Sequence, residues 1–150
     1  MEKEISAGAI IFIKSRKIKY LLLQYGLGHW GFVKGNIEKN EDMKQTIIRE
    51  AEEETGITDL EFIDGFKERE SYVYKLKGKL ISKEVIYLLA KTNTEKVKLS
   101  FEHQDYKWLA FDEALKYLKF KNAIKILKKA DDLLTNENIS LQKGLHKYLR

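Results

Sequence analysis

The feature that most constrains this chain is an acidic stretch at residues 35–57, which reads GNIEKNEDMKQTIIREAEEETGI. Seven of its twenty-three residues are Asp or Glu, although the whole chain has a formal net charge of +5. The apolar residues recur at the spacing of one helix face: Met43, Ile47, Ile48 and Ala51. This periodicity predicts an amphipathic helix over residues 41–55, with Asn40 as the N-cap and Gly56 as the C-terminal stop.

The predicted helix gathers three carboxylates beside its apolar face. At about 100° per residue, Glu50, Glu53 and Glu54 fall within an arc of about 100°, whereas Glu52 points elsewhere and is a surface charge. Such like charges repel one another unless a cation lies between them, and oxygen ligands of this kind suit Mg²⁺ or Mn²⁺. Arg49 can pair with Glu53 and orient it. The competing interpretations are a solvated acidic face and an ordinary surface salt bridge.

Composition bounds the class of protein. A chain of 150 residues with 43% hydrophobic residues is long enough for one domain with a buried core. No apolar run reaches the roughly 18 residues of a membrane span, and no signal peptide is recognisable, so we expect a cytoplasmic protein without membrane contact. The absence of cysteine leaves oxygen or imidazole ligands for a metal. The positive charge suits an anionic partner such as a nucleotide, polyphosphate or nucleic acid, or reflects a lysine-rich surface.

The rest of the chain contains strand-like segments followed by helical ones. Strands are expected at residues 4–13, 18–25, 60–76, 80–91 and 105–109, with a turn at residues 77–79 and a short extended piece at residues 31–34. Helices are expected at residues 111–118 and 122–134, then a polar break, TNEN, and a last helical piece at residues 139–150. One mixed sheet covered by helices accounts for this order. We expect a single domain over residues 1–150, with residues 136–150 as a C-terminal helical extension.

The acidic stretch also resembles the Nudix box in full. That pattern combines a glycine, a glutamate, an Arg-Glu pair, an apolar residue, two adjacent glutamates, a second glycine and a final apolar residue at fixed spacings. The positions are filled by Gly35, Glu41, Arg49, Glu50, Ala51, Glu53, Glu54, Gly56 and Ile57. The resemblance implies an α/β fold, the Nudix α/β/α sandwich with a mixed sheet. It also implies Mg²⁺-dependent hydrolysis of a nucleoside diphosphate linked to a further group.

Segments outside the box resemble the asymmetric diadenosine tetraphosphate (Ap4A) hydrolases. They are residues 27–35 (LGHWGFVKG), 84–89 (EVIYLL), 100–109 (SFEHQDYKWL) and 118–127 (LKFKNAIKIL). Two positions depart from that subfamily, which usually has a proline before the Lys-Gly pair and a histidine after it. Here these positions are Val33 and Asn36.

The resemblance implies roles for residues within and beside the box. The metal ligands are Glu50, Glu53, Glu54 and Glu102, with Glu53 and Glu54 as catalytic residues and Glu53 as the favoured base. Without the resemblance, Glu102 would be interpreted as a charged loop residue. Gly35 is expected to adopt a conformation closed to other residues, and Glu41 to brace the loop. Arg49 and Gly56 are structural members of the motif.

Five further residues match positions that the subfamily uses for substrate: His29, Lys34, Tyr72, Lys83 and Phe120. The histidine and the two lysines are expected around the polyphosphate, and the two aromatic rings on either side of an adenine. Because lysines are commonly only solvated and aromatic rings commonly belong to the core, these remain the competing interpretations. Trp30 and Trp108 are assigned to the core.

These matches predict a monomeric enzyme that cleaves Ap4A, a small dinucleoside polyphosphate, to ATP and AMP with Mg²⁺ or Mn²⁺. Two related activities stay open, because the box does not encode the rest of the substrate. They are removal of pyrophosphate from RNA 5′ ends and hydrolysis of damaged nucleoside triphosphates. A non-catalytic nucleotide- or RNA-binding module is the alternative from another class, but it predicts a degraded box.

Overall fold

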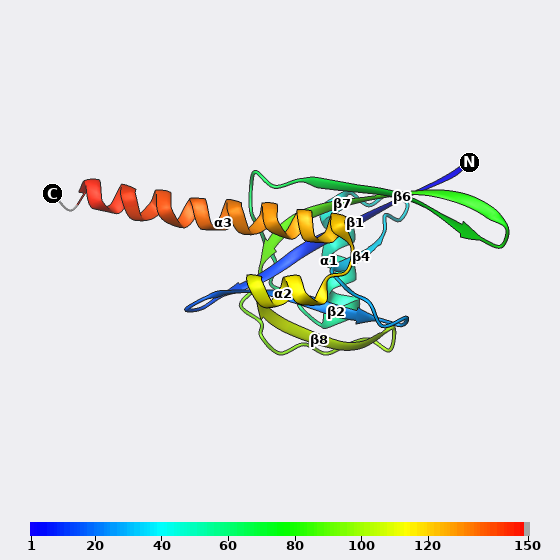
Figure 1. Ribbon diagram of the computed structural model, residues 1–150, viewed down its shortest axis with the longest axis horizontal. Helices are drawn as coiled ribbons and strands as arrows, with labels where there is room; N and C mark the ends of the chain where they lie inside the picture. Colours follow the sequence, from blue (N-terminus) through cyan, green and yellow to red (C-terminus); the bar gives the residue numbers. More distant parts are fainter. Residues whose placement is uncertain (149–150) are drawn as a thin grey trace.

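A mixed sheet, eight-stranded in the described part of the chain, forms the middle layer of the molecule (Figure 1). The computed structural model describes the backbone of residues 1–148 and the side chains of residues 1–136. The strands are β1 (Glu2–Lys14), β2 (Ile18–Tyr25), β3 (Trp30–Gly31), β4 (Val33–Asn36), β5 (Glu61–Phe62), β6 (Glu68–Leu76), β7 (Lys79–Lys91) and β8 (His103–Ala110). The central strands β1 and β7 are parallel, and the other pairs are antiparallel.

Helices cover both faces of this sheet (Figure 1). α1 (Met43–Thr55) packs on one face, and α2 (Phe111–Tyr117) and α3 (Lys121–Tyr148) begin on the other. Because side chains alternate along a strand, β1 contributes to both hydrophobic cores. On the α1 side lie Ala7, Ala9 and Ile11, and on the opposite side Ile10 and Phe12. The expected α/β/α sandwich is confirmed.

The start of α1 differs from the sequence prediction. Asp42, not Asn40, is the N-cap: its side chain accepts a hydrogen bond from Gln45 N at 2.8 Å, and the Gln45 side chain accepts one from Asp42 N at 2.8 Å. This reciprocal capping box satisfies two N–H groups at once. Asn40 lies two residues earlier with a φ of 70°, a left-handed conformation that asparagine tolerates. Gly56, with a φ of 76°, ends the helix as predicted.

The strands follow the predicted segments except at residues 31–34, where Phe32 separates β3 from β4, and at residues 60–76. That segment is divided into β5 and β6 by a turn that contains Gly65 at a φ of 90°. Lys77 and Gly78, both with positive φ, form the predicted tight turn between β6 and β7. Trp30 and Trp108 pack against the two cores, as assigned.

α3 contradicts the predicted break at TNEN. The helix runs without interruption from Lys121 to Tyr148, and Figure 1 shows its later turns extending beyond the sheet. TNEN contains neither proline nor glycine, so no backbone hydrogen bond is lost there. Residues 149–150 of the last predicted helical piece lie outside the described residues, and the division into a domain and an extension stays a prediction. Although α3 is long, no helix in the described chain is apolar enough to cross a membrane.

Candidate active site

A cleft of about 270 Å³ brings most of the predicted site residues together. It is lined by residues of the sheet, of α1 and of the turn before β8: Ser6, Tyr25, Lys34, Gly35, Asn36, Glu50, Glu54, Tyr72, Lys83 and Glu102. Glu53 does not line this cleft, and neither do His29 and Phe120. Elements far apart in the sequence therefore supply carboxylates, ammonium groups and aromatic rings to one cavity.

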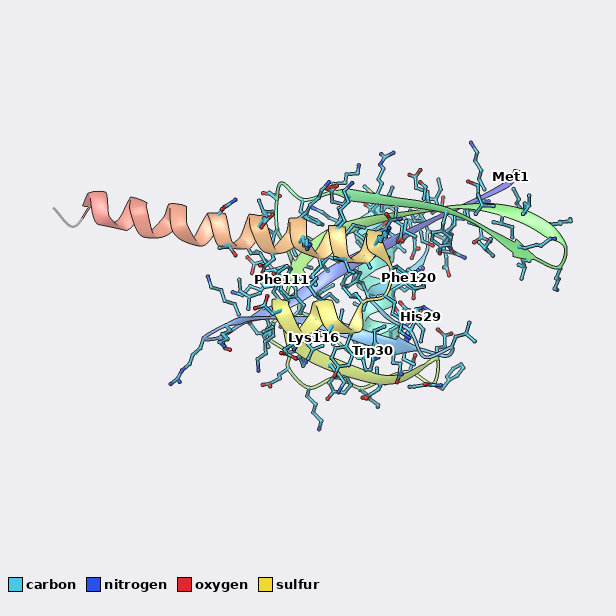
Figure 2. The ribbon with its side chains drawn as sticks, in the orientation of Figure 1. Met1, His29, Trp30, Phe111, Lys116 and Phe120 are labelled. Carbon is cyan, nitrogen blue, oxygen red and sulfur yellow. The ribbon has the colours of Figure 1, made fainter. Side chains whose placement is uncertain are left out.

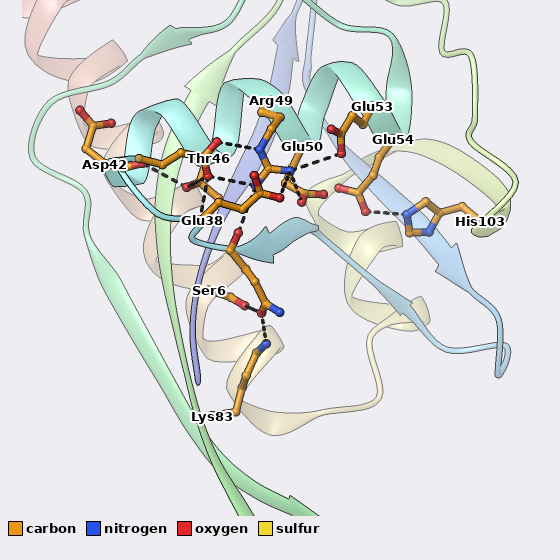
Figure 3. Close-up of polar contacts among 12 residues, drawn as sticks. Ser6, Glu38, Asp42, Thr46, Arg49, Glu50, Glu53, Glu54, Lys83 and His103 are labelled. Atoms are coloured by element: carbon orange, nitrogen blue, oxygen red, sulfur yellow. Dashed lines mark hydrogen bonds and ion pairs between the residues drawn. The ribbon is translucent and has the colours of Figure 1, made fainter. Parts of the chain in front are cut away.

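Arg49 holds the acidic residues of the box in place (Figure 3). Its Nε and Nη2 donate to the Glu41 carboxylate at 2.7 and 3.0 Å. Its Nη1 donates to Glu50 Oε1 at 2.8 Å, and its Nη2 to the Asn36 carbonyl oxygen at 3.1 Å. The predicted pair with Glu53 is present but longer, at 3.4 Å. The hydrogen bond from Arg49 lowers the pKa of Glu41 to about 2, and Glu41 also accepts a backbone N–H of the preceding loop, which it braces as expected.

Gly35 is required for space rather than for an unusual backbone conformation. It lies in β4 without a positive φ, so the expected conformation closed to other residues is wrong. A Cβ at this position would lie 2.0 Å from both Cδ and Oε1 of Glu50. The missing side chain lets the Glu50 carboxylate lie directly against β4, within reach of Arg49.

Glu54 is the only buried carboxylate in the described part of the chain. Its Oε1 lies 2.6 Å from Nε2 of the buried His103, and its Oε2 has no hydrogen-bond partner. Burial, followed by the charges of Glu50 and Glu102, raises the pKa of Glu54 to about 9. A buried, unpaired carboxylate oxygen beside further carboxylates is an arrangement that a bound divalent cation stabilises.

The donor set fits such a cation. Glu54, Glu102 and His103 offer ligand atoms that lie within 4.8 Å of one another. Glu50 lines the same cleft, and burial raises its pKa. Mainly carboxylate oxygens are the ligands of hard divalent cations. The Glu53 side chain is 59% exposed and contacts Arg49, so its part in metal binding stays a prediction.

A row of rings with one ammonium group runs from the cleft towards α3. Lys34 Nζ lies 5.8 Å from the centre of the Tyr72 ring and 5.9 Å from that of Tyr25. The Tyr25 ring stacks on His29 at 5.0 Å, and His29 meets Phe120 edge-on at 5.9 Å. Figure 2 shows His29 and Phe120 near each other, beside the start of α3. Tyr72 and Phe120 are 37% and 57% exposed, so neither belongs to the core.

Sequence reasoning missed Tyr25 and His103. Tyr25 donates a hydrogen bond from its hydroxyl to the Phe32 carbonyl oxygen, and its ring meets His103 edge-on at 4.7 Å. The position of His103 directly after Glu102 was a usable signal, because imidazole commonly orients or joins a carboxylate metal site. No local sequence pattern marked Tyr25 as a site residue, because it is the last residue of a predicted strand.

Fold and site together define a class of protein: a cation-assisted hydrolase built as an α/β/α sandwich. A family model described as NUDIX domain matches residues 3–130. The chain therefore belongs to the Nudix family, as the resemblance of the box implied.

Within the Nudix family, the chain is similar to proteins that are named for one activity. The bis(5′-nucleosyl)-tetraphosphatase (asymmetrical) of Sus scrofa is 38% identical to this chain, over 86% of this chain and 94% of that protein. The protein of the same name from Caenorhabditis elegans is 38% identical over 83% of this chain and 91% of its own length. A solved binary complex of a C. elegans Ap4A hydrolase has a TM-score of 0.78 at 36% identity, covering 89% of this chain and 98% of that chain. The expected likeness to asymmetric Ap4A hydrolases is confirmed.

Proposed function

We propose that this chain hydrolyses Ap4A asymmetrically to ATP and AMP, with Mg²⁺ as its cofactor and Mn²⁺ as a substitute. The observation that carries the proposal is the cleft, in which a carboxylate donor set lies beside Lys34, Lys83 and the exposed ring of Tyr72. A dinucleoside polyphosphate requires all three, because its phosphates need counter-charge and its bases need stacking faces. The similar proteins that are named for this activity support the choice.

The roles of the carboxylates follow from how each is held. A bound divalent cation neutralises phosphate charge and lowers the pKa of a bound water. Glu50, Glu54 and Glu102 would hold it, with Arg49 fixing Glu50 and His103 fixing Glu54. Glu53 is the base that we favour, because its exposed carboxylate has only the 3.4 Å contact with Arg49 and is open to an attacking water.

The remaining residues would bind the two parts of the substrate. Lys34, Lys83 and His29 would contact the polyphosphate. Tyr72 and Phe120, at the two ends of the row of rings, would lie on either side of an adenine and stack on it. We also expect a monomeric, cytoplasmic enzyme, which light scattering after gel filtration and cell fractionation would test.

Product analysis tests the proposal directly. Purified protein is incubated with Ap4A and Mg²⁺, and the nucleotides are separated by ion exchange. Equal amounts of ATP and AMP are expected. Formation of two ADP, or no turnover, would contradict asymmetric Ap4A hydrolysis. Parallel reactions with 5′-triphosphorylated RNA and with an oxidised nucleoside triphosphate measure the two related activities.

A further inference from the structure

We propose that Asn36 is a positioning residue that holds the Lys83 ammonium group at the polyphosphate in the cleft. The inference rests on the proposed function, because it takes Lys83 as a phosphate contact. Asn36 is the last residue of β4 and directly follows Gly35, and it is exposed at the cleft. Its side chain and its backbone serve two different parts of the site.

Lys83 is held by two acceptors on neighbouring strands. Its Nζ donates to Asn36 Oδ1 at 2.6 Å and to Glu4 Oε2 at 3.1 Å. The Lys83 side chain is only 12% exposed, although it lines the cleft. Since an ammonium group has three N–H donors, these two bonds leave one donor for a ligand.

The orientation of the Asn36 amide follows from its neighbours. Ser6 Oγ, which is buried, donates to the same Oδ1 at 2.8 Å, and Figure 3 shows Ser6 and Lys83 converging there. An ammonium group can only donate, so the amide oxygen and not the amide nitrogen must face Lys83. The buried serine thus fixes the amide, and the amide fixes the lysine.

The backbone of Asn36 belongs to the metal-ligand side of the cleft. Its carbonyl oxygen accepts from Arg49 Nη2 at 3.1 Å, and Arg49 Nη1 donates to Glu50 Oε1 at 2.8 Å. Truncation of the side chain, as in Asn36→Ala, removes the support of Lys83 and leaves this second contact in place. Substrate binding should therefore change while the metal ligands stay where they are.

The charge at position 36 also matters. Glu4 already gives Lys83 one negative partner, so a neutral amide leaves the ammonium group able to attract phosphate. A carboxylate at the same place would keep the geometry but surround the ammonium with two negative charges and repel phosphate. Asn36→Asp should therefore bind substrate worse than Asn36→Ala does.

Steady-state kinetics of five variants test the role of Asn36. We expect Asn36→Ala and Lys83→Met each to raise KM about tenfold, the loss of one charge-assisted hydrogen bond, with kcat within about threefold of wild type. The double variant should bind no worse than Lys83→Met alone. Tyr74→Phe is the matched control, because Tyr74 donates to Oε1 of Glu4 at 2.8 Å whereas Lys83 donates to Oε2, and it should leave both constants unchanged. A fall in kcat at constant KM, an additive double variant, or Asn36→Asp with wild-type KM would each overturn the proposal.

Binding of inorganic tripolyphosphate, measured by calorimetry, separates this inference from the proposed function. If wild type does not cleave Ap4A but Asn36→Ala still weakens tripolyphosphate binding about tenfold, only the proposed function is lost. If Ap4A is cleaved and Asn36→Ala binds tripolyphosphate like wild type, the role of Asn36 is lost instead. Tripolyphosphate binding to Asn36→Asp, which retains the acceptor oxygen, is measured in the same way.

Discussion

Replacing Gly35 by alanine should displace Glu50 while leaving the backbone of β4 unchanged. The new Cβ would lie 2.0 Å from two atoms of the Glu50 carboxylate end, far below the 3.0 Å that real Cβ contacts respect. Those atoms belong to a flexible side-chain end, so the glutamate can move away. Moving it breaks the 2.8 Å ion pair with Arg49 and takes a proposed cation ligand out of the cleft.

The size of the effect follows from these contacts. Overpacking a tight site costs about 1–3 kcal/mol. The side chains of Arg49 and Glu50 are 23% and 16% exposed, so the lost ion pair adds at most about 1 kcal/mol. In a domain of this size, such a loss lowers Tm by roughly 2–16 °C. Displacement of one ligand should reduce kcat/KM by about 100-fold.

Urea unfolding in EDTA, compared across single and double variants, identifies the cause. Glu50→Ala removes the colliding atoms, so Gly35→Ala combined with Glu50→Ala should be about as stable as Glu50→Ala alone. Gly26→Ala is the control, because a Cβ there meets nothing within 4 Å, and it should change the free energy of unfolding by less than about 1 kcal/mol. Strictly additive losses in the double variant would refute the steric explanation. The need for glycine at position 35 would then have to come from its backbone conformation.

Three further predictions concern the carboxylates. Glu53→Gln and Glu54→Gln should each lower kcat by about 10³-fold or more in a folded protein, because each removes a charge needed for metal binding or for proton transfer. Near-normal turnover in either variant would contradict the metal-site assignment. His103→Ala should lower kcat about 10–100-fold and weaken Mg²⁺ activation, since Glu54 loses the group that orients it, while His103→Gln, which keeps a donor, should lose less. The pKa of Glu41 is lowered from 4.5 to about 2, so its stabilisation is present above about pH 4.5 and is lost as the pH falls through about 2. Urea titrations between those pH values should show a shallower loss for Glu41→Gln than for wild type, and parallel curves would show that Glu41 is not the group responsible.

Periodicity in the sequence was sufficient for the fold, but not for the ends of its elements. The spacing of apolar residues predicted α1, and alternation predicted the long strands. Asn40 and Asp42 are both good caps, and only the reciprocal bond to Gln45 selects the second. The polar TNEN segment looked like a break, yet without proline or glycine a helix continues through it.

The site was predictable where it lies on one helix and not where elements meet. The helical arc separated Glu50 and Glu54 from Glu52, because angular position on a helix depends on sequence spacing alone. Contacts across the sheet have no such rule, so the pairing of Glu54 with His103 could not be derived from spacing. Gly35 illustrates the same limit: the need for glycine was visible, but the atom that excludes a side chain lies fifteen residues away.

The contacts of Arg49 explain why the box alone does not select a substrate. A guanidinium group has five N–H donors, and all five are used, on Glu41, Glu50, Glu53 and the Asn36 carbonyl oxygen. The arginine of the motif therefore has no donor left for a phosphate. Under the proposed function, phosphate charge beyond the cation would be met by Lys34 and Lys83, which lie outside the box on β4 and β7. Selection among phosphorylated substrates would then depend on those lysines and the adjoining rings, so substitutions there should change the preferred substrate while the hydrolytic step stays the same.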